Sequence, residues 1–159
     1  MSKGKLHPCG FAREVAESLI EQAPPGVRML IAGSLRRQKT FVHDIDIVAI
    51  VADETAQKRL DDWLANRFGR QANGKPARRG EIRGMAVDIY IATPEDVGAQ
   101  LLTWTGSAEY NIRMRAKAKR KGFKLNQYGL WRGDERVAGR TEAEIFEALG
   151  LEFKPPEKR

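Results

Sequence analysis

The chain has 159 residues, 42% of them hydrophobic, which is enough for one domain or for two small ones that share a site. Its formal net charge of +7 favours a polyanionic partner, although charge alone fits a well-solvated surface equally well. One cysteine (Cys9), no apolar leader and no long apolar run exclude disulfide-stapled secreted proteins and membrane-spanning proteins, so we expect a cytoplasmic protein without a membrane partner.

The first part of the chain predicts helices alternating with strands. Apolar residues at helical spacing predict a helix over 11–22, and Pro24-Pro25-Gly26 ends it. Strands are predicted over 27–32 and 45–52, the second of them rich in β-branched residues and typical of a buried strand. Asp53 is suited to cap a helix over 53–68, in which Trp63 packs inward.

A glycine-rich, basic segment separates this part from further strands. Residues 69–80 are predicted to form a loop or hairpin tip, where Arg78-Arg79 fits either phosphate contacts or a solvated turn. Strands follow over 81–83 and 85–92. Thr93-Pro94-Glu95 has the residue order of a helix start, and we place a subdomain boundary there.

The last part of the chain is basic. Residues 107–122 predict a helix rich in arginine and lysine, which is either a solvated or a phosphate-binding element. A hairpin is predicted over 123–131, with Trp131 as a packing residue. Thr141 and Glu144 predict a capping box for a helix over 141–149, and the tail from Pro155 is predicted to be a loose end.

Three aspartates are spaced for a metal site. Asp44 and Asp46 are one residue apart on a predicted strand, so their side chains point to the same face. Asp88 lies in a second apolar run and completes a cluster if the two strands are neighbours. Clustered carboxylates repel one another, and divalent cations relieve that repulsion. The alternative is that strand-end aspartates cap turns or pair with arginine.

Gly33-Ser34 lies upstream of these aspartates and offers backbone N–H groups and a hydroxyl to phosphate oxygens. Arg37 adds a guanidinium for the same phosphates, whereas Arg36 is open to a structural or solvent-facing role. These parts together predict a site for metal-assisted nucleotidyl transfer.

Five collinear motifs resemble the X family of DNA polymerases, the polymerase beta type. They are Gly33-Ser34-Leu35-Arg36-Arg37 with Asp44-Ile45-Asp46, Val87-Asp88-Ile89, Thr105-Gly106-Ser107 with Tyr110-Asn111 and Arg113-Met114-Arg115, the run 122–130, and the closing Pro155-Pro156-Glu157-Lys158-Arg159. The resemblance implies an α/β to α+β fold. A nucleotidyltransferase palm with a mixed sheet and helices (1–94) is followed by a small α+β thumb (95–159).

The resemblance also implies the chemistry of each site residue. Asp44 and Asp46 would bridge two Mg²⁺ ions, for which Mn²⁺ can substitute, and Asp88 would bind the catalytic ion and take a proton from the primer 3′-hydroxyl. The residues expected to bind the incoming nucleotide are Gly33, Ser34, Arg37, His43, Gly106 (at a strained or cis peptide) and Asn111. For His43, a passive loop position is the equal alternative.

A DNA-binding set is implied by the same resemblance. Arg115 would reach the template strand, one helical turn after Asn111. The remaining basic residues would contact phosphates without reading sequence: Lys117, Lys119, Arg120, Lys121 and Lys124. The expected partners are primer-template or gapped DNA and nucleoside triphosphates, and the protein is expected to be a monomer.

The chain departs from the family pattern at several points. No counterpart of the lyase and helix-hairpin-helix domains precedes residue 1, so we expect no deoxyribose-phosphate lyase activity. Thr103-Trp104 stands where the family often has Tyr-Phe, which leaves sugar selectivity open. Ala86 replaces a basic residue that often precedes the third carboxylate, and Arg83 is the candidate to compensate.

The expected function is DNA-directed gap filling in repair. The alternatives are a template-independent nucleotidyltransferase and a DNA-binding module whose active site is vestigial.

Overall fold

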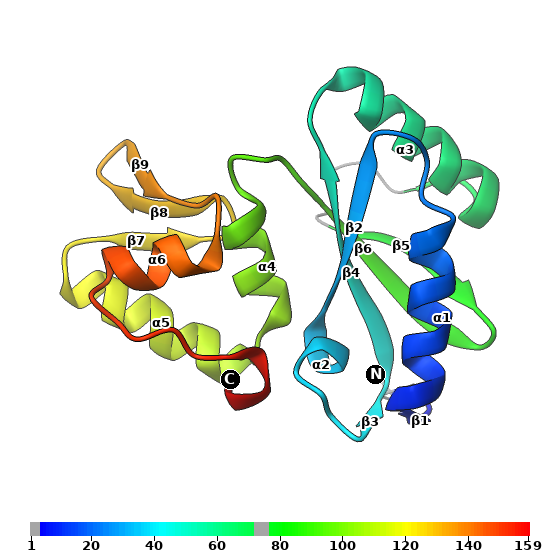
Figure 1. Cartoon of the computed structure of the whole chain (residues 1–159), viewed down its shortest axis with the longest axis horizontal. Coiled ribbons are helices and arrows are strands. Elements are labelled where there is room, and N and C mark those ends of the chain that lie inside the picture. The colour runs from blue at the N-terminus through cyan, green and yellow to red at the C-terminus, as the bar shows by residue number, and fades with distance from the viewer. Residues whose placement is uncertain (1–3, 72–76) are drawn as a thin grey trace.

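The computed structural model describes residues 4–71 and 77–159, whose elements form two groups joined through helix α4 (Figure 1). The first group is built on a four-stranded mixed sheet in the order β2-β4-β6-β5. Strand β2 (Val27–Ala32) runs antiparallel to β4 (Asp44–Val51), and β4 runs parallel to β6 (Met85–Ala92). Strand β5 (Ala77–Ile82) closes the other edge, antiparallel to β6.

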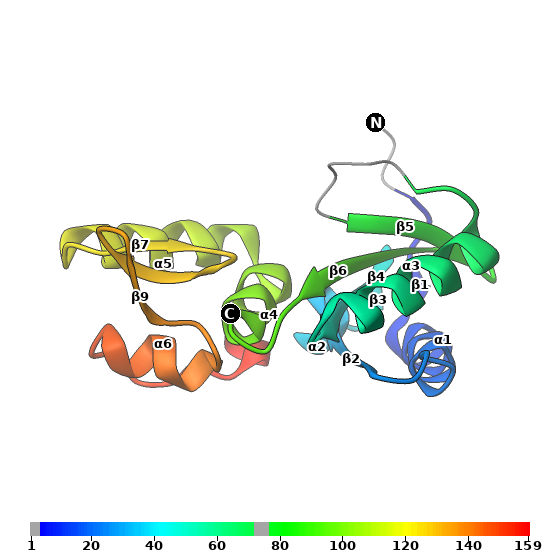
Figure 2. The ribbon, with the colours of Figure 1, turned by 90° about the horizontal axis from the view of Figure 1, so that it is seen from above.

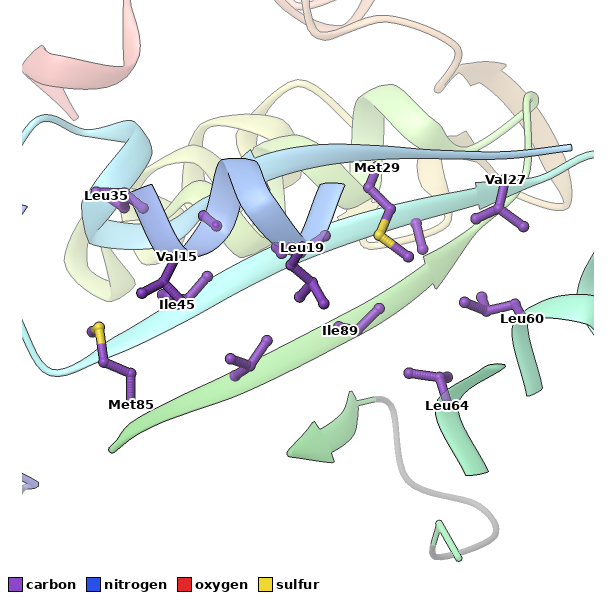
Figure 3. Packing of buried hydrophobic residues seen from close by; sticks show 14 of the residues in the cluster. Val15, Leu19, Val27, Met29, Leu35, Ile45, Leu60, Leu64, Met85 and Ile89 are labelled. Carbon is purple, nitrogen blue, oxygen red and sulfur yellow. The ribbon is translucent and has the colours of Figure 1, made fainter. Parts of the chain in front are cut away.

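Helices α1 (Cys9–Glu21) and α3 (Glu54–Phe68) cover one face of this sheet. The close-up in Figure 3 shows Val15 and Leu19 of α1 and Leu60 of α3 directed at the strands that carry Ile45 and Ile89. Because side chains alternate along a strand, a β4 residue next to Ile45 or Ile47 must point to the opposite face.

Helix α4 (Val97–Thr105) packs on that opposite face and belongs to both groups. Its Val97, Leu101 and Trp104 pack against a small buried cluster on the sheet, formed by Ala32, Val48 and Ala92. Its Ala99 and Leu102 belong to the hydrophobic core of the second group.

The second group is a helix pair around a three-stranded antiparallel sheet in the order β7-β8-β9. In Figure 2, α5 and α6 lie on opposite sides of this group. Its elements are α5 (Ala108–Arg120), β7 (Lys124–Asn126), β8 (Gly129–Arg132), β9 (Glu135–Ala138), α6 (Glu142–Ala148) and the 3₁₀ turn η1 (Pro156–Lys158).

Short elements complete the first group. Strand β1 (His7–Pro8) pairs antiparallel with β3 (Phe41–Val42). A four-residue helix, α2 (Gly33–Arg36), follows β2 directly. Within the described ranges 4–71 and 77–159, no helix has the length and apolarity needed to cross a bilayer.

The predicted helix caps are confirmed. Asp53 accepts a hydrogen bond from the backbone N–H of Ala56 at 2.8 Å, and Thr141 accepts one from Glu144 at 3.1 Å. In the predicted capping box, the Glu144 carboxylate accepts from the backbone of Gly139 and Arg140, ahead of the cap residue.

Three local predictions are wrong. The segment Thr93-Pro94-Glu95 forms a turn and α4 begins only at Val97, because the Asp96 carboxylate accepts the Thr93 N–H at 2.7 Å and closes that turn. Residues 77–80, predicted as loop, belong to β5, where pairing with β6 overrides the glycine-rich composition. The tail is ordered, and the Arg159 side chain is fully buried.

The predicted mixed α/β to α+β fold class is confirmed. The division into a palm (1–94) and a thumb (95–159) stays a prediction, and its boundary falls in the turn before α4.

Candidate active site

The three predicted carboxylates lie on one face of the four-stranded sheet. Asp46 of β4 pairs in register with Asp88 of β6, and Asp44 lies two residues before Asp46. The intervening Ile45 is fully buried in the core on the other face. The structure therefore brings the three aspartates together, each partly buried, on the face that α4 also occupies.

The electrostatics of Asp46 reflect this crowding. Its pKa is raised to about 7, first by burial and then by the charges of Asp44 and Asp88. A hydrogen bond from the Tyr90 hydroxyl and the charge of Arg37 act in the opposite direction. The protein surroundings of Asp46 therefore disfavour its charged form.

This donor set fits a divalent cation. Partly buried carboxylate oxygens on neighbouring strands are the ligands that Mg²⁺ prefers, and a cation would relieve the repulsion that raises the pKa of Asp46. In the described part of the chain, no three His, Cys, Asp or Glu side chains already stand in a complete metal-ligand arrangement. A bound ion would therefore draw the carboxylate oxygens toward itself.

Asp88 has a cationic partner in Arg79, which the sequence predicted only as a phosphate contact or part of a solvated turn. Burial raises its pKa, and the nearby charge of Arg79 acts against that rise. The Arg79 Nε lies 3.0 Å from Asp88 Oδ1. Arg83, the predicted compensating residue, instead lies over the Phe11 ring and 3.7 Å from Glu14.

Gly33 and Ser34 open α2 beside the carboxylates. Gly33 has φ +63°, which favours glycine, and a Cβ there would lie 2.1 Å from Asp46 Oδ2. A side chain at position 33 would therefore displace the Asp46 carboxylate. Ser34 follows it in the first turn of α2 and is partly buried.

The two adjacent arginines are held differently. Arg36 is structural: it donates to both carboxylate oxygens of Glu142, at 3.0 and 2.6 Å, and to Thr105 Oγ1 at 2.8 Å. Arg37 donates from Nη1 to the Thr105 carbonyl at 2.6 Å, while its buried Nε has no hydrogen-bond partner among the described residues. Burial lowers the pKa of Arg37, whereas the nearby charge of Asp46 acts to raise it.

The other predicted nucleotide-binding residues lie on separate elements. Gly106 ends α4 with φ +71° and forms a cis peptide with Ser107, as predicted. Asn111 on α5 donates to the Thr103 carbonyl at 2.7 Å, so it is bound back onto α4. The Nδ1 of His43 lies 2.6 Å from the Gly4 carbonyl oxygen.

The predicted DNA-binding side chains lie on and beyond α5. Lys117 is partly buried, and the other five are exposed: Arg115, Lys119, Arg120, Lys121 and Lys124. Lys121 differs, because its ammonium donates to the backbone carbonyl of Leu149 at the end of α6. Lys121 therefore caps the C-terminal end of α6, and its DNA contact stays a prediction.

The sequence-based prediction also missed Tyr90. Its hydroxyl donates to Asp46 Oδ1 at 3.5 Å, and its ring stacks on Trp104 with centroids 3.9 Å apart and planes 11° apart. Trp104 in turn donates to Gln100 at 2.7 Å. The signal was available, because Tyr90 is two residues after Asp88 and so shares its face.

Comparisons with known proteins agree with these features. A family model described as DNA polymerase beta thumb matches residues 100–159. The chain is 31% identical to "Repair DNA polymerase X" of African swine fever virus over 143 residues, covering 82% of this chain and 80% of that protein. It is also 31% identical over 162 residues to "DNA polymerase/3′-5′ exonuclease PolX" of Bacillus subtilis, covering 96% of this chain and 28% of that protein.

The fold is shared with a solved structure. The ternary complex of Leishmania infantum polymerase beta matches 99% of this chain and 77% of its own, with a TM-score of 0.79 and 22% identity.

Proposed function

The chain belongs to the X family of DNA polymerases and is thus a nucleotidyltransferase, and on that premise we propose that it fills short gaps in DNA during repair. The observation that carries the proposal is the group of Asp44, Asp46 and Asp88 on one sheet face, beside the Gly33-Ser34 turn. A viral relative of similar length is named as a repair polymerase, which supports the repair role.

We assign the acid–base roles to the aspartates. Family X polymerases generally use divalent metal ions, and we propose that Asp44 and Asp46 hold two Mg²⁺ ions here, with Asp88 as a ligand of one. When bound, the ions would lower the pKa of the attacking hydroxyl and neutralise charge on the leaving pyrophosphate. Asp88 accepts the proton of the primer 3′-hydroxyl as that oxygen attacks the α-phosphorus and the bond to pyrophosphate breaks.

The triphosphate is assigned to the turn that opens α2. The Ser34 hydroxyl and the adjacent N–H groups donate to phosphate oxygens, and Arg37 adds its positive charge and its Nε, which is unpaired among the described residues, as a further donor. His43 remains a candidate near the triphosphate. Gly106 and Asn111 are assigned to the nucleotide's sugar and base.

Primer-template or gapped DNA is assigned to the basic residues of the second group. The contacts we propose come from Arg115, Lys117, Lys119, Arg120, Lys121 and Lys124, and they make binding salt-dependent. We also propose that the active enzyme is a monomer.

A gapped-duplex assay tests the proposal. The protein should insert the nucleotide that the template specifies, and Asp88→Ala should abolish insertion while leaving triphosphate binding largely intact. The matched control is Asp62→Ala, which removes an exposed carboxylate from α3 across the sheet and should leave insertion unchanged.

The outcomes separate the alternatives. Insertion that ignores the template would point to a template-independent transferase. Duplex binding that is equal with and without EDTA, with no insertion, would point to a binding module. Activity of Asp88→Ala within tenfold of the parent would contradict the role of Asp88.

A further inference from the structure

Arg79 of β5 lies directly opposite Asp88 on the neighbouring strand β6. The register of β5 and β6 pairs the two residues, and the Arg79 Nε is 3.0 Å from Asp88 Oδ1. The Asp88 side chain is 16% exposed, whereas that of Arg79 is 80% exposed. The arginine therefore approaches the carboxylate from the solvent side of the site.

The backbone explains why these side chains meet. The N–H and C=O of Arg79 point away from β6, because both are bonded to the side-chain amide of Gln71, at 2.8 and 3.1 Å. Arg79 and Asp88 consequently form a non-hydrogen-bonded pair of the antiparallel ladder, the kind in which opposite side chains are closer. Gln71 also donates to the Gly69 carbonyl at 3.2 Å, which ties this outer contact to the end of α3.

The ion pair contributes little to folding. Pairs this exposed are worth only about 0–1 kcal/mol, since water and salt screen them. Its effect is local: one oxygen of Asp88 is engaged, and the second can turn toward a substrate. Asp46 is held by a different group, the Tyr90 hydroxyl, so the two carboxylates have separate partners.

We propose that Arg79 is a positioning residue for nucleotidyl transfer: its Nε holds one Asp88 oxygen so that the other meets the primer 3′-hydroxyl. The inference rests on the proposed function, because it concerns the residue assigned to accept that proton. The planar guanidinium fixes the orientation of the carboxylate and also balances its charge. A lysine ammonium balances the charge without fixing the orientation.

The test compares Arg79→Ala and Arg79→Lys with Arg83→Ala in single-nucleotide gap filling. Arg83 is a matched control, since it is an exposed, ion-paired arginine on the same hairpin that does not contact a carboxylate of the site. Arg79→Ala should lower kcat by about 10- to 100-fold, the scale for a misplaced reacting group, with KM for the nucleotide within about twofold. Arg79→Lys should stay well below the parent, and Arg83→Ala should match the parent.

DNA affinity supplies a readout besides activity. Fluorescence anisotropy across a salt series should give all variants the parent's affinity and salt dependence. A loss of affinity by Arg79→Ala with a salt slope shallower by about one would make Arg79 a phosphate contact and overturn the inference. Unchanged kcat would also overturn it. A parent without templated insertion would overturn the proposed function, and this inference with it.

Discussion

At the residue scale, Asp46 lies on the sheet in surroundings that disfavour its charged form. Burial and two neighbouring carboxylates raise its pKa to about 7. The folded chain therefore holds a proton on Asp46 between about pH 4 and 7 that the unfolded chain has released. In that window the native state binds more protons, so this contribution to stability is lost as the pH rises.

Asp46→Asn should remove this dependence. Without divalent metal, the parent should lose stability from pH 5 to pH 8, and the variant should be more stable than the parent at pH 8 by on the order of 1–3 kcal/mol. Urea unfolding at several pH values with EDTA measures this. Adding Mg²⁺ at pH 8 should stabilise the parent but not the variant. A parent whose stability rises from pH 5 to pH 8 would contradict the electrostatics described for Asp46.

Some residue roles could be predicted and others could not. The common face of Asp44 and Asp46 follows from the two-residue period of a strand, and the caps at Asp53 and Thr141 follow from side-chain chemistry. The pairing of Arg79 with Asp88 was not predicted, because it depends on cross-strand register, which the sequence of β5 alone does not fix.

At the element scale, α4 is the helix that both cores share, and a glycine sets its distance from α6. A Cβ on Gly98 would lie 2.3 Å from the backbone of Thr141, the residue that caps α6. Real Cβ atoms do not approach backbone this closely, so α4 and α6 must separate if position 98 carries a side chain.

Gly98→Ala should therefore lower the free energy of unfolding by about 1–3 kcal/mol. Gly10→Ala is the control, because it lies in α1 with no atom within 4 Å of the added Cβ. That control should be neutral or stabilising by up to about 1 kcal/mol through helix propensity. Chemical denaturation measures both, and equal stability of the two variants would exclude close packing as the reason for Gly98.

Long periodic elements were predicted well, and tertiary contacts decided the rest. Helices α1 and α3 and strands β2, β4 and β6 lie where their apolar patterns place them. Strand β9 and the strand at 77–80 were missed, because their polar sequences become strands only through pairing with β8 and β6.

At the scale of the whole molecule, one carboxylate links the two groups of elements. Glu142 at the start of α6 accepts from Arg36 of α2 and from the fully buried Arg159. Arg159 also lies 5.4 Å from the ring centroids of Phe146 and Phe153. The predicted loose tail is ordered because this side chain finds a charge partner and aromatic neighbours inside the fold.

Glu142→Ala should be strongly destabilising. It leaves two guanidinium groups without their shared carboxylate, one of them buried, at a cost of about 3–5 kcal/mol. The control is Glu147→Ala, an exposed glutamate on the same helix, which should change stability by less than about 0.5 kcal/mol. Urea unfolding measures both. A loss below about 1 kcal/mol for Glu142→Ala would show that Arg36 and Arg159 do not need Glu142 as their shared partner.

The contact between Gln71 and Arg79 also bears on how copies of this protein meet in solution. Strand β5 is an edge of the four-stranded sheet, and unpaired edges are templates for aggregation. At Arg79 the amide of Gln71 already fills the place that an incoming strand would take. The Gln71 side chain thus blocks this edge of the sheet beside the active site. A second molecule cannot add a strand there without first displacing that amide.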